Sequence, residues 1–261
     1  MKKLNQDNEA ELRAFLAVEP HYNLFLIGDL DAFGFDDTIQ TYYGDYKDGE
    51  LVGVIFRFRD DSIHIYATEI QESLIVMIDK LFKDLPFKRI MVTKPTMDLL
   101  GDHILPYIQK PRPTTMSVYT PNDFDVDTHS VQRLDATFAA QIAHIETLAF
   151  ASEESRDVDR IRTGIESGER VVYGFVEDGN VVTVASYVAQ TEFSAMIVGV
   201  ATLENARKKG YATQVVKKLS DDLYAAGKQG VLFYDNPNAA RIYEKMGYAP
   251  LTQYFMNDVK R

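Results

Sequence analysis

A short basic segment, Arg207-Lys208-Lys209-Gly210-Tyr211-Ala212, stands out for its chemistry in an acidic chain. An apolar run that ends at Thr202 precedes it, and an amphipathic stretch over residues 210–226 follows it, which predicts a strand, a loop and a helix. The first amides of a helix have no partner within the helix, and the helix dipole places partial positive charge there. Glycine at this point lets a phosphate approach the backbone. The segment therefore suits a pyrophosphate, although by itself it is also well explained as an ordinary turn before a surface helix.

A second pattern, VLFYDNPNAARIYEKMGY at residues 231–248, follows the next predicted strand. Asn236 is placed to cap a helix over 238–246. Tyr243 follows the small Ala239 by about one turn on the same helix face. A tyrosine hydroxyl in that position can donate a proton to a leaving group, although a lone helix tyrosine is more commonly a half-buried packing residue.

Together the two patterns resemble the GNAT superfamily of acyl-CoA-dependent N-acyltransferases, in particular its two-domain members of the glycine-N-acyltransferase-like or FR47-like subgroup. The pyrophosphate loop of that family reads [Gln/Arg]-x-x-Gly-x-[Gly/Ala], and Arg207, Gly210 and Ala212 match it. The later family motif, Asn-x-x-Ala-x-x-x-Tyr-x-x-x-Gly-[Phe/Tyr], is matched from Asn236 to Tyr248. The resemblance covers residues 128–261 and rests on both motifs in the right order.

This resemblance implies acetyl-CoA (coenzyme A) as the cofactor. The cofactor-binding residues that it implies are Val200, Ala201, Thr202, Arg207, Lys208, Lys209, Gly210, Tyr211, Ala212, Thr213, Asn236, Ala239 and Tyr243. It also implies direct transfer of the acyl group to an amine, without a covalent enzyme intermediate. A backbone amide around residues 198–200 would polarise the thioester carbonyl, and Tyr243 would protonate the departing thiolate.

The general base is left open. Many relatives carry a glutamate at the position of Met196, which cannot accept a proton. Glu192 continues the same face of the expected strand at period two, so it is a candidate catalytic residue acting through water. Glu146, Glu153 and Glu154, in the expected helical segment, are alternatives, and each of the four is also well explained as a solvated surface carboxylate. An amine of low pKa would need no base.

The elements around these residues follow the order β-α-α-β-β-β-α-β-α-β over residues 128–261. Strands are expected at 131–134, 170–176, 181–189, 195–202, 231–234 and 247–258, and helices at 135–149, 152–167, 210–226 and 238–246. Residues 1–127 show the similar order α-α-β-β-β-α-β-α, but no glycine separates the strand over 62–67 from the helix over 72–83. Prolines at 106, 111, 113 and 121 mark the connection between the halves.

These patterns predict an α/β (α+β) protein of the GNAT fold, with a mixed central sheet flanked by helices. We expect a catalytic acyl-CoA-binding domain over 128–261, in tandem with a degenerate GNAT-like domain over 1–127 that lacks a cofactor loop. The first half is expected to contribute packing surface or a wall of the acceptor pocket.

Composition excludes several classes of protein. The net charge of −11 is concentrated in residues 1–127, which hold 13 Lys and Arg against 22 Asp and Glu, whereas residues 128–261 hold 15 against 17. Phosphate repulsion therefore disfavours nucleic-acid binding. The chain has no cysteine, and its five histidines lack metal-ligand spacing, so neither a disulfide nor a metal site is expected. Without a signal-peptide core or an apolar run of about 20 residues, a cytoplasmic protein that does not span a membrane is expected.

The predicted function is that of an N-acetyltransferase (EC 2.3.1.-), acting on a primary amine of a small molecule, an amino acid or a peptide. The alternative is a non-catalytic sensor or interaction protein that binds acyl-CoA without turning it over. The acceptor, the acyl-chain preference and the choice between monomer and homodimer stay open.

Overall fold

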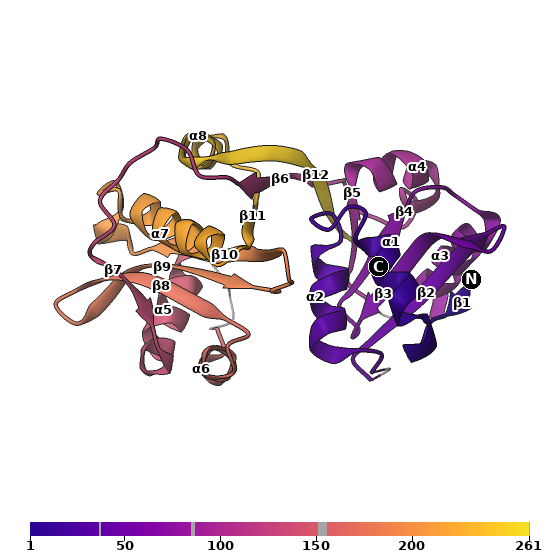
Figure 1. Cartoon of the computed structure of the whole chain (residues 1–261), viewed down its shortest axis with the longest axis horizontal. Coiled ribbons are helices and arrows are strands. Elements are labelled where there is room, and N and C mark those ends of the chain that lie inside the picture. The colour runs from indigo at the N-terminus through magenta and orange to yellow at the C-terminus, as the bar shows by residue number, and fades with distance from the viewer. Residues whose placement is uncertain (37, 85–86, 151–155, 261) are drawn as a thin grey trace. The chain divides into compact units, whose positions relative to one another are not determined.

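The computed structural model describes residues 1–36, 38–84, 87–150 and 156–260 (Figure 1). The chain divides into two compact units, which are treated separately below. Unit 1 consists of Met1–Met116 and Leu251–Arg261, and unit 2 consists of Ser117–Pro250. Each unit contains a mixed sheet with helices on both faces, which confirms the predicted fold class.

Unit 1 has the strand order β1-β2-β3-β4-β5-β12. Its strands are β1 (Lys2–Lys3), β2 (Gln40–Lys47), β3 (Glu50–Phe58), β4 (Ser62–Ala67), β5 (Arg89–Thr93) and most of β12 (Tyr248–Asp258). Its helices are η1 (Gln6–Asn8), α1 (Glu9–Leu16), α2 (Leu24–Phe33), α3 (Glu72–Asp84) and α4 (Lys94–Ile104). β4 and β5 are parallel, and the other neighbours are antiparallel.

Alternation along β3 shows why both faces of this sheet are covered. Val54 and Phe56 belong to the core cluster that also contains side chains of α1 and α2, whereas Ile55 belongs to the cluster with side chains of α3 and α4. Successive side chains of a strand point to opposite faces, so a continuous apolar run requires a helical layer on each side.

Unit 2 repeats this arrangement with the order β7-β8-β9-β10-β11-β6. Its strands are β7 (Val131–Leu134), β8 (Val171–Glu177), β9 (Asn180–Val188), β10 (Ser194–Thr202), β11 (Gln229–Tyr234) and the end of β6 (Pro113–Tyr119). Its helices are η2 (Ala136–Phe138), α5 (Ala139–Ala149), α6 (Val158–Ser167), η3 (Glu204–Ala206), α7 (Tyr211–Ala225) and α8 (Pro237–Met246). β10 and β11 are parallel, as are β4 and β5 in unit 1.

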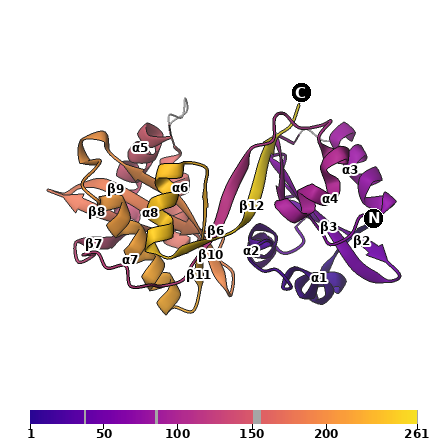
Figure 2. The same cartoon turned by 90° about the horizontal axis from the view of Figure 1, so that it is seen from above.

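The helices of unit 2 form two layers. α7 and α5 lie on opposite faces of the sheet (Figure 1). Val172 and Val184 pack with side chains of α5 and α6, whereas Tyr173 and Ala185, their neighbours in sequence, pack with side chains of α7. α8 follows β11 and contributes Met246 to the α7 layer (Figure 2).

The last strand of each unit comes from the other half of the sequence. β12 ends the chain but pairs antiparallel with β5 of unit 1, with Tyr254 opposite Thr93. β6 follows α4, and its end lies beside β11 in unit 2, where Ser117 Oγ donates a hydrogen bond to Leu232 O at 3.1 Å. No single cut in the sequence therefore separates the two units. Whether residues 1–127 and 128–261 have separate roles stays a prediction.

Local rules explain the element ends. Asp135 caps the helical segment after β7, because its Oδ1 accepts from Thr137 N at 2.9 Å, and the segment becomes α-helical at Ala139. The helix expected over 152–167 is α6, and residues 152–155 of that expectation lie outside the described residues. α4 begins at Lys94 and has Pro95 in its first turn, where proline is tolerated because it removes only an N–H that has no partner within the helix.

Candidate functional site

The basic loop leads into α7 with the backbone accessible. β10 ends at Thr202, η3 follows, and α7 begins at Tyr211. Gly210 is the N-cap residue with φ of 85°, and no side chain caps the first turn of α7. A Cβ at Gly210 would meet no heavy atom within 4 Å. The first amides of α7 are therefore available to an anion, as the sequence pattern predicts.

The three cations of the loop differ in their surroundings. Arg207 Nε donates to Thr202 O at 3.3 Å, which holds this side chain at the end of β10. Arg207 and Lys208 are exposed and form no ion pair among the described residues. Lys209 Nζ lies 4.0 Å from Glu177 Oε1, so part of its charge is offset. The positive charge available to a ligand therefore comes mainly from Arg207 and Lys208.

Tyr211 packs against β8. Its ring stacks on Phe175 with centroids 4.0 Å apart and an interplanar angle of 15°. Its hydroxyl donates to the Glu177 carboxylate, and this hydrogen bond raises the pKa of Tyr211. Because the side chain is already engaged, the backbone N–H is the group of Tyr211 that fits its predicted role in cofactor binding.

β10 and β11 separate beside this loop. Their parallel pairing runs from Ser194 opposite Gln229 to Ile197 opposite Leu232, although β10 continues to Thr202. On the other side of β10, the register with β9 shifts between Val198 and Ala201. Gly199, inside this bulge, has φ of 64°. Residues 198–200 therefore lie where β10 leaves β11.

α8 holds the second set of predicted residues. Asn236 caps the helix, since its Oδ1 accepts from Asn238 N at 2.9 Å. Tyr243 is half-buried, with ring centroids 5.7 Å from Tyr234 and 5.9 Å from Tyr248. Burial raises the pKa of the Tyr243 hydroxyl, which has no hydrogen-bond partner among the described residues. The phenol therefore stays protonated near neutral pH and is available as a donor.

Comparison with known proteins shows what this chain is similar to. Residues 172–256 match the FR47-like protein family, and a search of curated proteins found no match. Three solved structures are similar over nearly the whole chain. A GNAT-family acetyltransferase from Colwellia psychrerythraea has a TM-score of 0.63 at 14% identity, with 99% of each chain covered. A Drosophila protein has a TM-score of 0.69 at 10% identity, with 99% of this chain and 98% of its own covered. A tandem GNAT protein from the clavulanic acid biosynthesis pathway has a TM-score of 0.63 at 11% identity, with 99% and 97% covered.

At these identities the structural similarities show the fold. The chain has the tandem GNAT fold, with an FR47-like domain in its second half. That domain contains the basic loop, Asn236 and Tyr243, so the residues that carry the resemblance in the sequence lie inside the matched segment.

The parallel pairing of β10 and β11 places the predicted residues at one edge of the sheet. α7 follows β10 and α8 follows β11, and the two strands are parallel. The carboxyl ends of parallel strands lie at one edge of a sheet, so the first turns of both helices begin at that edge. Val200, Ala201 and Thr202 form the end of β10 at the same edge, with Ala201 buried and the other two half-buried. Ala212, Thr213 and Ala239 lie in the first turns of the two helices.

The expectation for the position of Glu192 is wrong. β10 begins at Ser194, and Glu192 is exposed in the bend before it. Thr191 causes this bend, because its Oγ1 accepts from Phe193 N at 3.2 Å and from Ser194 N at 3.0 Å. The strand rise of ~3.3 Å per residue puts the start of β10 roughly 17 Å from Gly199, and Glu192 lies beyond that start. Of the other candidate bases, Glu146 lies beside Gly199, and Glu153 and Glu154 lie outside the described residues.

The structure also places beside Glu146 two residues that sequence reasoning missed, Arg170 and Ser186. Arg170 forms an ion pair with Glu146, and Arg170 Nη2 and Nε donate to Ser186 Oγ at 2.9 and 3.1 Å. Gly199 lies against this group. A glycine inside the apolar run of β10 was the one signal in the sequence, since a strand glycine commonly marks a bulge or a close approach.

The described residues contain neither a metal-ion cluster nor a membrane-spanning helix. No group of three or more His, Asp or Glu residues that could hold a metal ion lies among residues 1–36, 38–84, 87–150 and 156–260. Within the same ranges, no helix has both the length and the apolar composition that crossing a membrane requires.

Proposed function

We propose that unit 2 binds acyl-CoA, with acetyl-CoA as the first donor to test, and transfers the acyl group to a primary amine of a small molecule, an amino acid or a peptide. The observation that carries the proposal is the uncapped first turn of α7, with Gly210 at its start and Arg207 and Lys208 beside it. This turn lies at the edge of the sheet where β10 separates from β11. A helix start of this kind suits a pyrophosphate.

The residues present fit the donor along its length. The amides of residues 211–213 and the side chains of Arg207 and Lys208 would hold the pyrophosphate. The separation of β10 from β11 leaves the backbone of residues 198–200 without a β11 partner, and these groups would bind the pantetheine arm and the thioester carbonyl. When bound, acetyl-CoA supplies an acyl group activated as a thioester.

Tyr243 is the proposed proton donor to the departing thiolate. Burial raises the pKa of its hydroxyl, so the hydroxyl is protonated when the thiolate forms and can donate the proton to it. A hydrogen bond from a backbone N–H of residues 198–200 would polarise the carbonyl. The acceptor amine would enter deprotonated. Among the described candidates for a base, the Glu146 carboxylate is already paired with Arg170, and Glu192 lies before the start of β10. We therefore assign no carboxylate as the base.

Unit 1 is proposed to be a degenerate copy that does not bind the donor. The segment between β4 and α3, Thr68-Glu69-Ile70-Gln71, contains neither glycine nor a basic residue. In the first turn of α3, Ser73 donates a hydrogen bond to Asp45, which is 1% exposed. A buried carboxylate at this helix start opposes the binding of a phosphate.

The test is calorimetric titration of acetyl-CoA into the wild type and into a Gly210→Glu variant. Glutamate at residue 210 places negative charge and bulk where the pyrophosphate would bind, so binding in the micromolar range is expected to disappear. Gly227→Glu is a matched control, since Gly227 follows the other end of α7 with φ of 82° and equally open surroundings. Absence of binding by the wild type would refute the proposal.

The second candidate function, a non-catalytic acyl-CoA sensor, is favoured by Met196, which replaces the glutamate of many relatives. Release of free CoA in the presence of a panel of amines distinguishes the two functions. A sensor would bind acetyl-CoA and release no CoA with any amine.

A further inference from the structure

We propose that Glu146, Arg170 and Ser186 form a buried positioning network that sets the geometry of the β10 bulge and thereby aims its backbone amide at the thioester carbonyl. The inference rests on the proposed function, because the aimed amide has a role only if an acyl-CoA binds. These three residues do not touch the reacting atoms in the proposal. They act through the backbone of residues 198–200.

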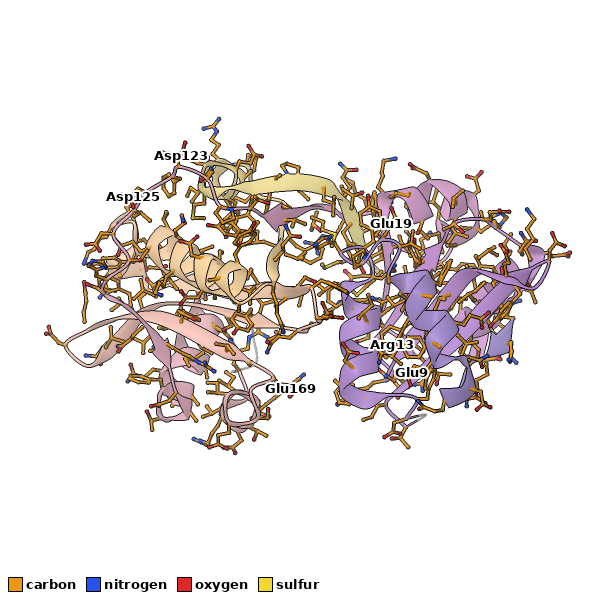
Figure 3. All side chains as sticks on the ribbon, in the orientation of Figure 1. Glu9, Arg13, Glu19, Asp123, Asp125 and Glu169 are labelled. Carbon is orange, nitrogen blue, oxygen red and sulfur yellow. The ribbon has the colours of Figure 1, made fainter. Side chains whose placement is uncertain are left out.

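The network joins three elements that are distant in sequence. Arg170, just before β8, is fixed by its own backbone, because its N–H donates to Gly164 O in α6 at 2.8 Å. Its guanidinium donates to the Glu146 carboxylate from α5 and to Ser186 Oγ from β9. Only 6% of the Glu146 side chain and 16% of the Arg170 side chain are exposed. Glu169, the residue before Arg170, is exposed at the turn between α6 and β8 (Figure 3).

The network contacts the bulge from two sides. Ser186 lies opposite Val198, the last residue of β10 in register before the shift. Glu146 Oε1 lies so close to Gly199 that a Cβ at this position would overlap it, and Arg170 Nη2 would be 3.3 Å from the same Cβ. The bulge is therefore fixed at two points. Val198 pairs with Ser186 across the strands, and Gly199 packs against the Glu146 carboxylate, where any larger residue would overlap it.

The buried ion pair is better explained by the single conformation that it imposes on the bulge than by a contribution to the free energy of unfolding. Two charges removed from water lose hydration energy that their mutual attraction only partly restores, so a buried ion pair adds little stability compared with apolar side chains. It does fix one geometry, since a planar guanidinium has set donor directions. A bulge re-aims backbone groups, and a carbonyl-polarising amide must be placed within a few tenths of an ångström.

The experiment measures the carbonyl directly. Infrared difference spectra of bound [1-13C]acetyl-CoA report the carbonyl stretch, and calorimetry reports the Kd for acetyl-CoA. In the wild type, we expect the stretch to fall below that of free acetyl-CoA. In Glu146→Gln/Arg170→Gln and in Ser186→Ala, we expect the stretch to return toward the free value, with the Kd changed by no more than about threefold, since the pyrophosphate site is untouched.

The variants are chosen to fold. Glu146→Gln alone would leave Arg170 buried without a counter-charge, whereas the double variant removes both charges. Asp221→Asn is the control for loss of a partly buried ion pair elsewhere, since Asp221 Oδ2 lies 2.6 Å from Lys217 Nζ on α7. This control is expected to keep the shifted carbonyl stretch.

A second readout needs no ligand. Amide hydrogen exchange of residues 198–200 in the free protein is expected to accelerate in both network variants and not in Asp221→Asn. The inference would be overturned if the network variants kept the lowered carbonyl stretch of the wild type and the wild-type exchange rates at residues 198–200. If the wild type binds no acetyl-CoA, the proposed function fails, and unchanged exchange in the variants would then still reject the network.

Discussion

Tyr243 has the surroundings of a proton donor. Its ring packs beside Tyr234 and Tyr248, its hydroxyl has no partner among the described residues, and burial raises its pKa from 10.0. Because burial raises the pKa of this hydroxyl above that of a free tyrosine, the group keeps its proton under neutral conditions. Its own ionisation should therefore not limit turnover between pH 7 and pH 9.

Replacing Tyr243 with phenylalanine tests this role. We expect Tyr243→Phe to lower kcat by roughly 100-fold or more, because a positioned general acid typically contributes about 10²–10⁴-fold. The Kd for acetyl-CoA should change by less than about threefold. Release of CoA with an accepted amine measures kcat, and Tyr224→Phe, at a 44% exposed tyrosine of α7, is the control. An unchanged kcat in Tyr243→Phe would remove the tyrosine from the mechanism.

His64 in unit 1 predicts a pH dependence of stability. It is buried between Phe25 and Phe56, and burial lowers the pKa of its imidazole to about 3. Because the folded-state pKa lies below the unfolded value of 6.5, the stabilisation is fully present above pH 6.5 and is lost as the pH falls from 6.5 toward 3.

Urea unfolding at pH 7 and pH 4.5 measures this loss. At pH 4.5, two units below 6.5, the free energy of unfolding should be lower by at most roughly 3 kcal/mol. Each pH unit over which only the unfolded state is protonated contributes about 1.4 kcal/mol. His64→Gln should remove this part of the acid destabilisation, whereas His103→Gln, at an exposed histidine of α4, should not. Equal losses in the wild type and in His64→Gln would contradict the assignment.

At the scale of elements, β10 depends on one glycine. Gly199 has φ of 64°, and a Cβ there would overlap Glu146 Oε1. Gly199→Ala is therefore expected to lower the free energy of unfolding by about 2 kcal/mol or more, of which the left-handed backbone accounts for about 1 kcal/mol. Gly179→Ala, in an open turn with φ of 78°, should show only the backbone part.

A double-mutant cycle separates the two contributions. If the overlap with Glu146 is real, Gly199→Ala should cost less in a Glu146→Ala/Arg170→Gln background than in the wild type, by about 0.5 kcal/mol or more, because contacting residues are not additive. Chemical denaturation of the four proteins provides the measurement. Strict additivity would mean that the side chain of Glu146 does not constrain the bulge.

At the scale of the whole molecule, residues 251–261 are structurally important, because they complete the sheet of unit 1. β12 gives unit 1 the buried side chains of Tyr254, Phe255 and Asn257. It also covers the edge of β5 from Arg89 to Thr93. Removing residues 251–261 would expose that edge and lose two buried aromatic side chains, each contributing about 1.5–3 kcal/mol.

Amide hydrogen exchange on such a truncated chain should therefore show its largest loss of protection in β5, although the deletion lies at the end of the second half. β9, in unit 2, should stay protected, since its partners β8 and β10 are intact. Removal of residues 260–261 alone is the control. Greater loss in β9 than in β5 would contradict the assignment of β12 to unit 1.

The sequence by itself determined the features that depend on neighbours along the chain. The alternation of apolar residues, the caps at Asp135 and Asn236 and the turn residues predict nearly every strand and helix, because these signals act over a few residues. The basic loop and Tyr243 are equally local, since each falls at a fixed distance from the end of a strand. They were sufficient to indicate the GNAT fold.

Only the tertiary structure decided which segments meet. Glu146 and Arg170 are 24 residues apart and come together because α5 and α6 fold back on the sheet, a pairing that no local pattern encodes. The position of Glu192 depended on hydrogen bonds of Thr191 that end the strand early. β6 and β12 have ordinary strand sequences. The unit to which each belongs depends on the edge strand beside which it lies, β11 for β6 and β5 for β12. Backbone pairing is nearly independent of sequence, so the neighbours of these strands are set by the packing of the whole fold.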